Sequence, residues 1–231
     1  MINKYKITNI IENFAPIETQ EAWDCSGWLV ETANPQISKI MLALTVTEDI
    51  LNQARQNNCD MIISHHPLFF IPLEFRNIDI YCAHTNFDKA QGGTSDILIK
   101  TIFPDLEIEQ CGDFLRICSL KTPIKIEDFV QKLKFLSPNL RYVNNHNITE
   151  IKKIAFCAGS GSDFIQESFE SGADALVTGD LKFHAALESP IVLFDIGHFE
   201  SEILSLKVLK NLIGNKIEII FAKETGPFKY L

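Results

Sequence analysis

The stretch Cys82–Lys89, C-A-H-T-N-F-D-K, has a counterpart near the other end of the chain, Ile196–Ile203, I-G-H-F-E-S-E-I. Each stretch follows a short apolar run, and each places a carboxylate four residues after a histidine. The two pairs are His84 with Asp88, and His198 with Glu202. The second pair lies 114 residues after the first.

The same offset of 114 residues aligns other landmarks of the sequence. They are Lys39-Ile40 with Lys153-Ile154, Asp49 with Asp163, Asp60 with Asp174, and His65-His66 with Gly179-Asp180. A constant offset over several landmarks is what a gapless duplication leaves in a sequence. The chain is therefore predicted to contain two copies of one structural unit.

Each copy contains apolar runs of strand length separated by helical patterns. The predicted order is strand 40–44, helix 48–57, strand 61–63 and strand 78–83, then strand 154–158, helix 163–171, strand 175–177 and strand 191–194. Strand–helix–strand order favours parallel βαβ units with helices on the sheet. The predicted fold class is α/β: two similar three-layer α/β/α halves with mostly parallel sheets and a metal site between them.

The predicted division of the chain has three parts. Residues 1–115 form the first repeat with an N-terminal helix, 116–152 a bridging strand–helix segment, and 153–231 the second repeat. The polar cluster Asn144–Asn147 is the best candidate boundary.

Composition excludes several classes of protein. The net charge of −9 gives no basic footprint for nucleic acid or an anionic membrane. No signal peptide is expected at the start, and no apolar run approaches the length of a transmembrane helix. Six cysteines without C-x-x-C spacing indicate buried free thiols in a reducing compartment. We expect a cytoplasmic protein.

The candidate chemistry lies at strand ends, because ligand groups collect past the carboxyl ends of parallel strands. Four histidines and three carboxylates stand there: His65, His66, His84, His198, Asp88, Asp180 and Glu202. On a helix, residues four apart share one face, so His198 and Glu202 can bind the same ion. Imidazole with carboxylate suits Zn, Fe, Mn, Co or Ni. The sequence predicts a site for two divalent metal ions.

Simpler interpretations exist for several of these residues. A His-His dipeptide also occurs in loops by accident, and a histidine four residues before an acid commonly makes a solvated helix contact. Asp180 either caps a helix that begins at Leu181 or supports the site, and His184 faces either the site or the solvent.

The turn Gly159–Ser162, G-S-G-S, also has two interpretations. Its backbone N–H groups, with Ser160 and Ser162, suit a bound phosphate of a substrate. Alternatively it is a tight turn in which Ser162 is a helix N-cap.

The motifs resemble one family over nearly the whole chain. They are I-I-S-H-H-P-L at residues 62–68, A-H-T-N-F-D at 83–88, T-G-D at 178–180 and G-H-F-E-S-E at 197–202, together with Trp23-Asp24 and the G-S-G-S turn. This set is similar to the NIF-three-like proteins, which carry the name GTP cyclohydrolase I type 2 homologue. The length resembles the family's short form.

The resemblance implies a dinuclear metal centre and a ring-shaped homohexamer. Its ligands would be His65, His66, Asp88, His198 and Glu202. His84 would hold the segment of Asp88 in place and is a candidate substrate contact. Two departures from the family pattern stand out: Thr45 where an aspartate is expected, and Cys25 where an asparagine is expected.

Two functions of different classes follow. The first is a metal-dependent hydrolase with a nucleotide or other heterocyclic small molecule as substrate, in which Asp180 or His184 carries a proton. The second is a non-enzymatic metal chaperone that delivers ions to a cofactor or partner. A protein whose metals only stabilise its assembly is a third interpretation.

Overall fold

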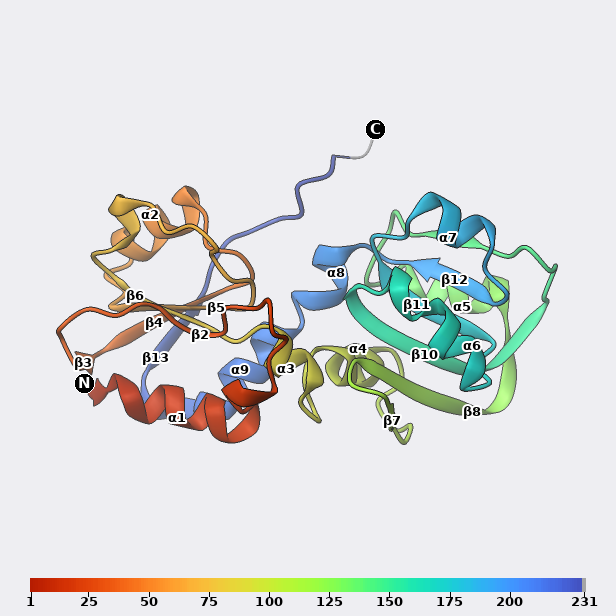
Figure 1. Cartoon of the computed structure of the whole chain (residues 1–231), viewed down its shortest axis with the longest axis horizontal. Helices are drawn as coiled ribbons and strands as arrows, with labels where there is room; N and C mark the ends of the chain where they lie inside the picture. Colours follow the sequence, from red (N-terminus) through yellow and green to blue (C-terminus); the bar gives the residue numbers. More distant parts are fainter. Residues whose placement is uncertain (230–231) are drawn as a thin grey trace. The chain divides into compact units, whose positions relative to one another are not determined.

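The computed structural model describes residues 1–229, and the chain forms two units (Figure 1). Unit 1 contains residues 1–93 and 205–225, and unit 2 contains residues 94–204 with a C-terminal segment that begins at Gly226. This division differs from the predicted ranges 1–115, 116–152 and 153–231. The bridging segment 116–152 is part of unit 2, and residues 205–225 belong to the first unit rather than the second.

Unit 1 contains a five-stranded sheet with the order β13-β4-β5-β6-β2. The strands are β2 (Gly27–Val30), β4 (Lys39–Ala43), β5 (Met61–Ser64), β6 (Asp79–Cys82) and β13 (Glu218–Phe221). The pairs β13–β4, β4–β5 and β5–β6 are parallel, and only β2 is antiparallel to its neighbour. The carboxyl ends of β4, β5 and β6 therefore meet at one edge of this sheet.

Helices cover both faces of the sheet in unit 1 (Figure 1). They are α1 (Lys4–Phe14), α2 (Glu48–Gln56), α3 (Thr85–Lys89) and α9 (Ser205–Ile213), with 3-10 turns η1 (Ile17–Thr19), η2 (Leu73–Phe75) and η4 (Gly214–Lys216) and a small ladder of β1 (Ile2–Asn3) with β3 (Gln36–Ile37). Helix α2 buries Ile50, Leu51 and Ala54 against one face. Helices α1 and α9 pack together on the other.

Unit 2 contains a six-stranded sheet with the order β7-β8-β10-β11-β12-β9. Its strands are β7 (Glu109–Cys111), β8 (Leu115–Lys125), β9 (Arg141–Val143), β10 (Glu150–Ser160), β11 (Ala175–Gly179) and β12 (Val192–Asp195). Only β10–β11 and β11–β12 are parallel. The other three pairs are antiparallel, because β7, β8 and β9, which lie between the two predicted repeats or at their boundary, add to the sheet edges. The expectation of a mostly parallel sheet does not describe this unit.

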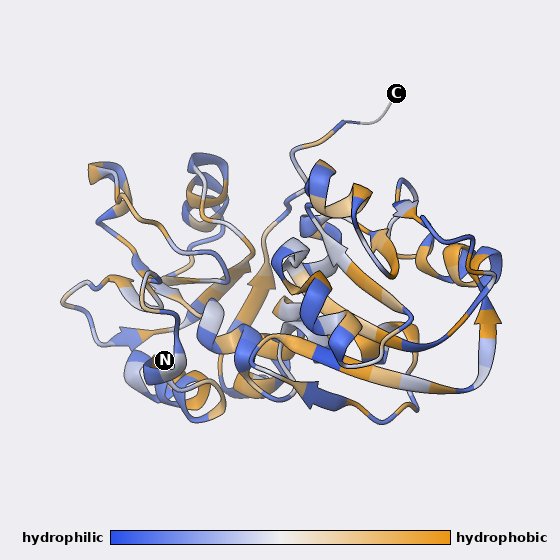
Figure 2. Cartoon of the chain, turned by 45° about the vertical axis from the view of Figure 1, so that its right-hand side comes forward, coloured by the Kyte–Doolittle hydropathy of each residue, from blue (hydrophilic) through white to orange (hydrophobic). Residues whose placement is uncertain are grey.

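Two hydrophobic clusters lie on the two faces of the sheet in unit 2. The helices are α4 (Thr94–Ile102), α5 (Ile126–Leu133), α6 (Ile165–Glu170), α7 (Phe183–Leu187) and α8 (His198–Glu202), with the 3-10 turn η3 (Ser162–Phe164). Residues of α4 and α5 form one cluster with the sheet, and residues of α6 and α7 pack with the other. In Figure 2 much of the strand ribbon has hydrophobic colour, and the helices alternate between hydrophilic and hydrophobic residues.

The helices that follow the two histidine–carboxylate segments lie outside the unit that supplies those segments. Helix α4 follows α3 in the chain but packs on β10 and β8 in unit 2. Helix α9 follows α8 but packs on β4 in unit 1. This exchange of helices explains why the units do not coincide with the two predicted repeats.

One hydrogen-bond pattern recurs in the two units. The N–H of Asp60 donates to the carbonyl of Lys39 (2.9 Å), and the N–H of Asp174 donates to that of Lys153 (2.7 Å). Each aspartate carboxylate also accepts two backbone N–H groups near the beginning of the same strand. The partners are separated by the offset of 114 residues that the sequence shows.

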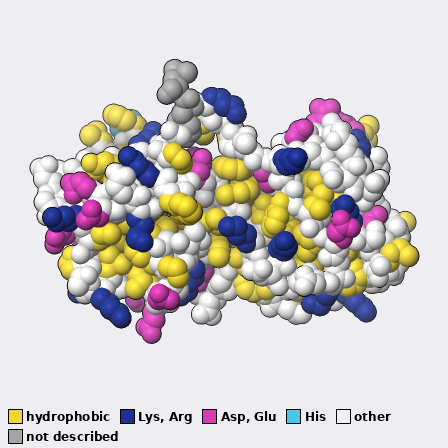
Figure 3. Space-filling model, turned by 180° about the vertical axis from the view of Figure 1, so that it is seen from behind, with side chains coloured by type: hydrophobic (Ala, Val, Ile, Leu, Met, Phe, Trp, Pro, Cys, Tyr) yellow, Lys and Arg dark blue, Asp and Glu magenta, His cyan; other side chains and the backbone are white. Residues whose placement is uncertain are grey.

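Two further properties concern possible partners. Among the described residues, no helix combines the length and apolar composition needed to cross a membrane. On the face shown in Figure 3, lysine and arginine side chains are scattered among acidic ones and form no single basic patch.

Candidate metal centre

The histidines of unit 1 follow the carboxyl ends of β5 and β6. His65 and His66 come directly after β5, and their N–H groups continue the ladder to the carbonyls of Ala43 and Leu44. His84 precedes α3, which carries Asp88. One ring nitrogen from each of the three histidines lies within 4.8 Å of the other two. The predicted gathering at this sheet edge is therefore present within unit 1.

His65 is fully buried, and its ring orientation is fixed. Its Nδ1 lies 2.9 Å from the carbonyl oxygen of Ala83. A carbonyl only accepts, so Nδ1 carries the proton and the lone pair is on Nε2. Nε2 lies 3.5 Å from Oδ1 of Asp88. Nε2 of His65 and Oδ1 of Asp88, two atoms that could each bind a metal ion, thus lie next to each other.

His84 is held by a carboxylate that accepts many hydrogen bonds. Its Nδ1 donates to Oδ1 of Asp24 (2.9 Å), whose other oxygen accepts from Ser26 and from the N–H and hydroxyl of Thr85. Burial by itself would raise the pKa of Asp24, but the bonds from Thr85 and His84 outweigh it and hold that pKa at about 2. Burial, followed by the nearby His65, lowers the pKa of His84. At neutral pH, His84 is neutral, with its lone pair on Nε2.

His66 contacts Thr45, one of the two departures from the family pattern. The Nδ1 of His66 lies 2.6 Å from Oγ1 of Thr45. The N–H groups of Leu44 and Thr45 donate to the carboxylate of Glu224, at 2.6 and 3.4 Å. Burial raises the pKa of Glu224, while these two N–H groups and His66 act in the opposite direction.

The histidine of unit 2 lies between two carboxylates. His198 Nδ1 donates to Oδ2 of Asp180 (2.7 Å), and Nε2 lies 2.9 Å from Oε2 of the buried Glu202. The hydrogen bond to Glu202 raises the pKa of His198 to about 9, against the effect of burial and with help from Asp180. With no metal bound, a proton therefore lies between Nε2 of His198 and Oε2 of Glu202 at neutral pH.

Two glycines allow α8 to lie close to the ends of β10 and β11. A Cβ at Gly159 would stand 2.2 Å from Oε1 of Glu202, and Gly159 has φ +71°. A Cβ at Gly179 would stand 2.6 Å from the backbone nitrogen of His198. Side chains at these positions would displace the pair His198–Glu202.

Of the two proton carriers predicted in unit 2, Asp180 lies beside His198 and His184 is exposed. Asp180 has φ +52° and binds His198, whereas α7 begins at Phe183 with Lys182 at its N-cap. The interpretation of Asp180 as a helix cap is therefore wrong. His184 is exposed on α7 and contacts the ring of Phe183.

The turn Gly159–Ser162 is held by hydroxyl groups of the protein. The N–H groups of Ala158, Gly159 and Gly161 donate to Ser95, Ser201 and Thr178. The Ser162 hydroxyl bonds to Asp180 and Lys182, so it is not a helix N-cap, and Ser160 is exposed. These bonds favour the tight turn over a phosphate cradle, because two N–H groups of the turn, those of Gly159 and Gly161, are already engaged.

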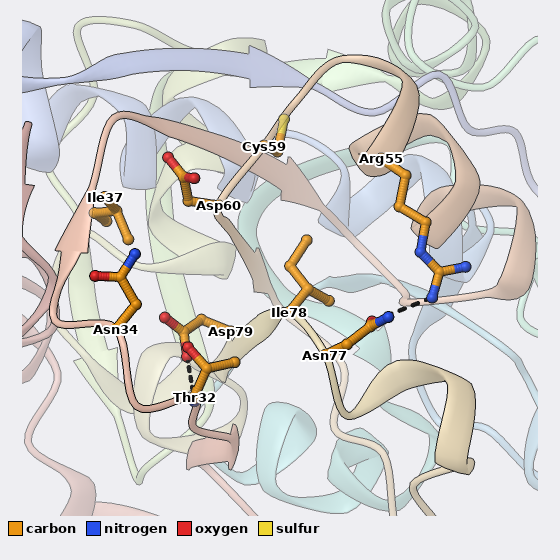
Figure 4. A pocket seen from close by; sticks show the side chains of 9 residues that line it. All are labelled: Thr32, Asn34, Ile37, Arg55, Cys59, Asp60, Asn77, Ile78 and Asp79. Atoms are coloured by element: carbon orange, nitrogen blue, oxygen red, sulfur yellow. Dashed lines mark hydrogen bonds between the residues drawn. The ribbon is translucent and has the colours of Figure 1, made fainter.

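A separate cavity lies at the other edge of the sheet in unit 1 (Figure 4). It has a volume of about 410 Å³ and contains none of the predicted site residues. Its carboxylates already have partners: Asp79 binds Lys4 and the N–H of Thr32, and Asp60 binds backbone N–H groups. Both carboxylates of the cavity are therefore already engaged within the protein.

The donor groups fit divalent transition metals. Three of the four histidines place Nδ1 against a carbonyl or carboxylate, which is the support that metal-ligating histidines usually have. In each unit a histidine Nε2 faces a carboxylate oxygen. Imidazole with carboxylate suits zinc, iron, manganese, cobalt or nickel.

The fold and these donor groups define a mixed α/β protein with clusters of residues that could bind a metal. The chain belongs to the Duf34/NIF3 (NGG1p interacting factor 3) family, whose model matches residues 2–227. The sequence-based assignment to this family is confirmed.

Known proteins of similar sequence span the whole chain. The GTP cyclohydrolase 1 type 2 homolog of Clostridium perfringens is 31% identical over 97% of this chain and 98% of its own length. The protein of the same name from Campylobacter jejuni is 32% identical, with the same coverage of 97% and 98%. The hypothetical protein SA1388 of Staphylococcus aureus has the same fold, with a TM-score of 0.87, 22% identity and 99% of both chains covered.

The close approach at Gly159 leads to a testable prediction. In the metal-free Gly159→Ala variant, the new Cβ displaces Glu202, so the pKa of His198 falls from about 9 towards its ordinary value of 6.5. A raised pKa contributes stability that is fully present below about pH 6.5 and is lost as the pH rises through about 9. This pH-dependent component should shrink in the variant. NMR titration of His198 measures the pKa.

Gly172→Ala is the matched control. Gly172 has a similar φ of +79°, but a Cβ there meets nothing within 4 Å. Both variants share the strain of a left-handed alanine, and only Gly159→Ala should alter His198. An unchanged His198 titration in Gly159→Ala would contradict this role of Gly159.

Proposed function

We propose that this protein binds two divalent metal ions and is a metal-dependent hydrolase. The observation that carries the proposal is the fixed orientation of the histidines. His65, His84 and His198 each donate Nδ1–H to an acceptor, so Nε2 is in each case the ring nitrogen left to bind a metal, after loss of its proton in the case of His198. For His65 and His198, a carboxylate oxygen faces that nitrogen. Such pairs without a cation cost several kcal/mol per desolvated charge.

The proposed ligands are the five residues that the family resemblance implies: His65, His66, Asp88, His198 and Glu202. The assignment of these five residues to two ions rests on this resemblance. Zinc, iron, manganese, cobalt and nickel all suit the donors, and the metal is not assigned further. A bound divalent ion would polarise an electrophile and lower the pKa of water towards about 7.

Residues around the ligands have proposed roles of their own. Asp24 fixes the ring of His84, whose Nε2 is then a candidate contact for substrate. Asp180 holds His198 in the orientation that presents Nε2, and this positioning role replaces the proton-carrier role that was expected for it. His184 stays a candidate proton carrier, and Ser160, exposed on its turn, a candidate substrate contact.

We also propose that the chain arose by internal duplication. The recurring bonds of Asp60 and Asp174, and the exchange of α4 and α9, support this proposal. The duplication would explain why a five-residue segment that begins with a histidine and ends with a carboxylate follows the third strand of each repeat. These segments are His84–Asp88 and His198–Glu202.

Metal content tests the proposed ligand set. Purified wild-type protein loaded with Zn²⁺ should retain about two ions per chain by elemental analysis. His66→Ala and Glu202→Ala should each lose at least one ion, because each removes a direct donor. Turnover of GTP by the loaded protein, lost on chelation, would support the hydrolase, since relatives carry the name GTP cyclohydrolase 1 type 2 homolog.

His146→Ala is the control, since His146 is exposed in a turn and bonds to none of these residues. It should keep the wild-type metal content. Wild-type stoichiometry in both His66→Ala and Glu202→Ala would refute the ligand set.

We propose a homohexamer, on the resemblance alone. Light scattering at micromolar concentration should give about six times the chain mass of 26.1 kDa. A monomer would contradict the ring.

A further inference from the structure

The support of His66 differs from that of the other three histidines. His65, His84 and His198 have a carbonyl or a carboxylate at Nδ1, and these groups can only accept a proton. His66 has the hydroxyl of Thr45, which can donate or accept. The hydroxyl alone therefore does not determine which ring nitrogen of His66 carries the proton.

A carboxylate binds the backbone of Thr45 and of the residue before it. Glu224 accepts the N–H of Leu44 through Oε1 (2.6 Å) and the N–H of Thr45 through Oε2 (3.4 Å). It is half-buried, and His66 is near enough to act on it electrostatically. The N–H of His66 itself binds the carbonyl of Leu44 (2.8 Å). Both the backbone and the ring of His66 are thus tied to the segment that Glu224 holds.

The position of Glu224 does not depend on these two bonds alone. It follows β13, which pairs with β4, and the N–H of Ala222 continues that ladder to Leu42. The side chain of Gln53 then binds both the N–H and the carbonyl of Lys223, each at 2.8 Å. The C-terminal segment is therefore already fixed up to the residue before Glu224.

We propose that Glu224 is a positioning residue for His66 and acts through Thr45. Its two bonds place Thr45 so that Oγ1 meets Nδ1 of His66. Its negative charge favours the tautomer in which Nδ1–H points to Thr45, which puts the lone pair on Nε2, as in His65 and His84. A carboxylate 179 residues away in sequence thus supplies the charge that a hydroxyl at position 45 lacks.

This inference rests on the proposed metal-binding function, since an oriented His66 matters most as a ligand. Partners that orient a metal-ligating histidine typically change metal affinity 10- to 100-fold when they are removed. A merely structural role for Glu224, as a link between the C-terminal segment and β4, would change stability without changing His66.

The test uses the full chain with Glu224→Gln and Thr45→Val. Glutamine keeps an oxygen for the N–H of Leu44 but loses the charge and places an amide opposite Thr45. Valine keeps the shape of threonine and loses the hydroxyl. Each variant should weaken Zn²⁺ binding about tenfold in a competition titration. The double variant should be weakened about as much as each single variant, because both act through one chain of contacts.

The second measurement is the tautomer of His66 in the metal-free protein, from long-range ¹H–¹⁵N NMR correlations. The wild type should show the Nδ1–H form, and both variants a mixture. The matched control is Glu218→Gln, which removes a carboxylate from the same segment where it pairs with Lys39 at the surface. It should leave both measurements unchanged.

The outcomes separate this inference from the proposed function. If wild-type protein binds no metal, the proposed function fails, and the tautomer still decides the role of Glu224. A wild-type tautomer and wild-type Zn²⁺ affinity in Glu224→Gln would overturn the inference, whatever happens to stability. If Glu224→Gln changes the Zn²⁺ affinity and the His66 tautomer but Thr45→Val changes neither, Glu224 does not act through Thr45.

Discussion

The candidate centre depends on one constraint, the anchoring of imidazole rings through Nδ1. A neutral histidine has one donor and one acceptor nitrogen, so an obligate acceptor at Nδ1 decides that Nε2 has the lone pair. Ala83, Asp24 and Asp180 are these acceptors for His65, His84 and His198. Everything else in the arrangement, from the strand ends to the glycines, serves to bring such rings beside carboxylates.

The electrostatics of the metal-free protein agree with this description. The imidazole of His198, next to Glu202, has a pKa of about 9, well above its ordinary value of 6.5. It therefore keeps its second proton at neutral pH. A divalent cation would compete with that proton for the same nitrogen and oxygen. Binding of metal should therefore release protons, as it does wherever ligands must be deprotonated. The buried carboxylates are tolerated in the meantime because hydrogen bonds hold them, as five donors hold Asp24.

Sequence alone predicted the elements that depend on local pattern. The strands at 40–44, 61–63 and 78–83, and those of the second copy, correspond to β4, β5, β6, β10, β11 and β12 within a few residues. The histidines stand at their carboxyl ends because parallel pairing brings those ends together. The family was also predictable, because its motifs are short and contiguous.

Other features could not be read from the sequence, because they depend on distant contacts. The exchange of α4 and α9 and the pairing of β13 with β4 join segments far apart in the chain, and no periodicity signals them. Glu224 was missed for this reason: its partners Leu44 and Thr45 lie about 180 residues away. The bond from His198 to Asp180 was not predicted, because it joins residues 18 positions apart and Asp180 has a positive φ that the sequence does not signal.

X-ray absorption spectroscopy of the Zn²⁺-loaded protein tests the central claim most directly. The account predicts nitrogen and oxygen neighbours at about 2.0–2.1 Å, with the outer-shell scattering that imidazole rings produce. Sulfur neighbours at about 2.3 Å would instead assign the metal to the chain's cysteines. That result, or a shell of oxygen without imidazole scattering, would contradict the histidine–carboxylate centre.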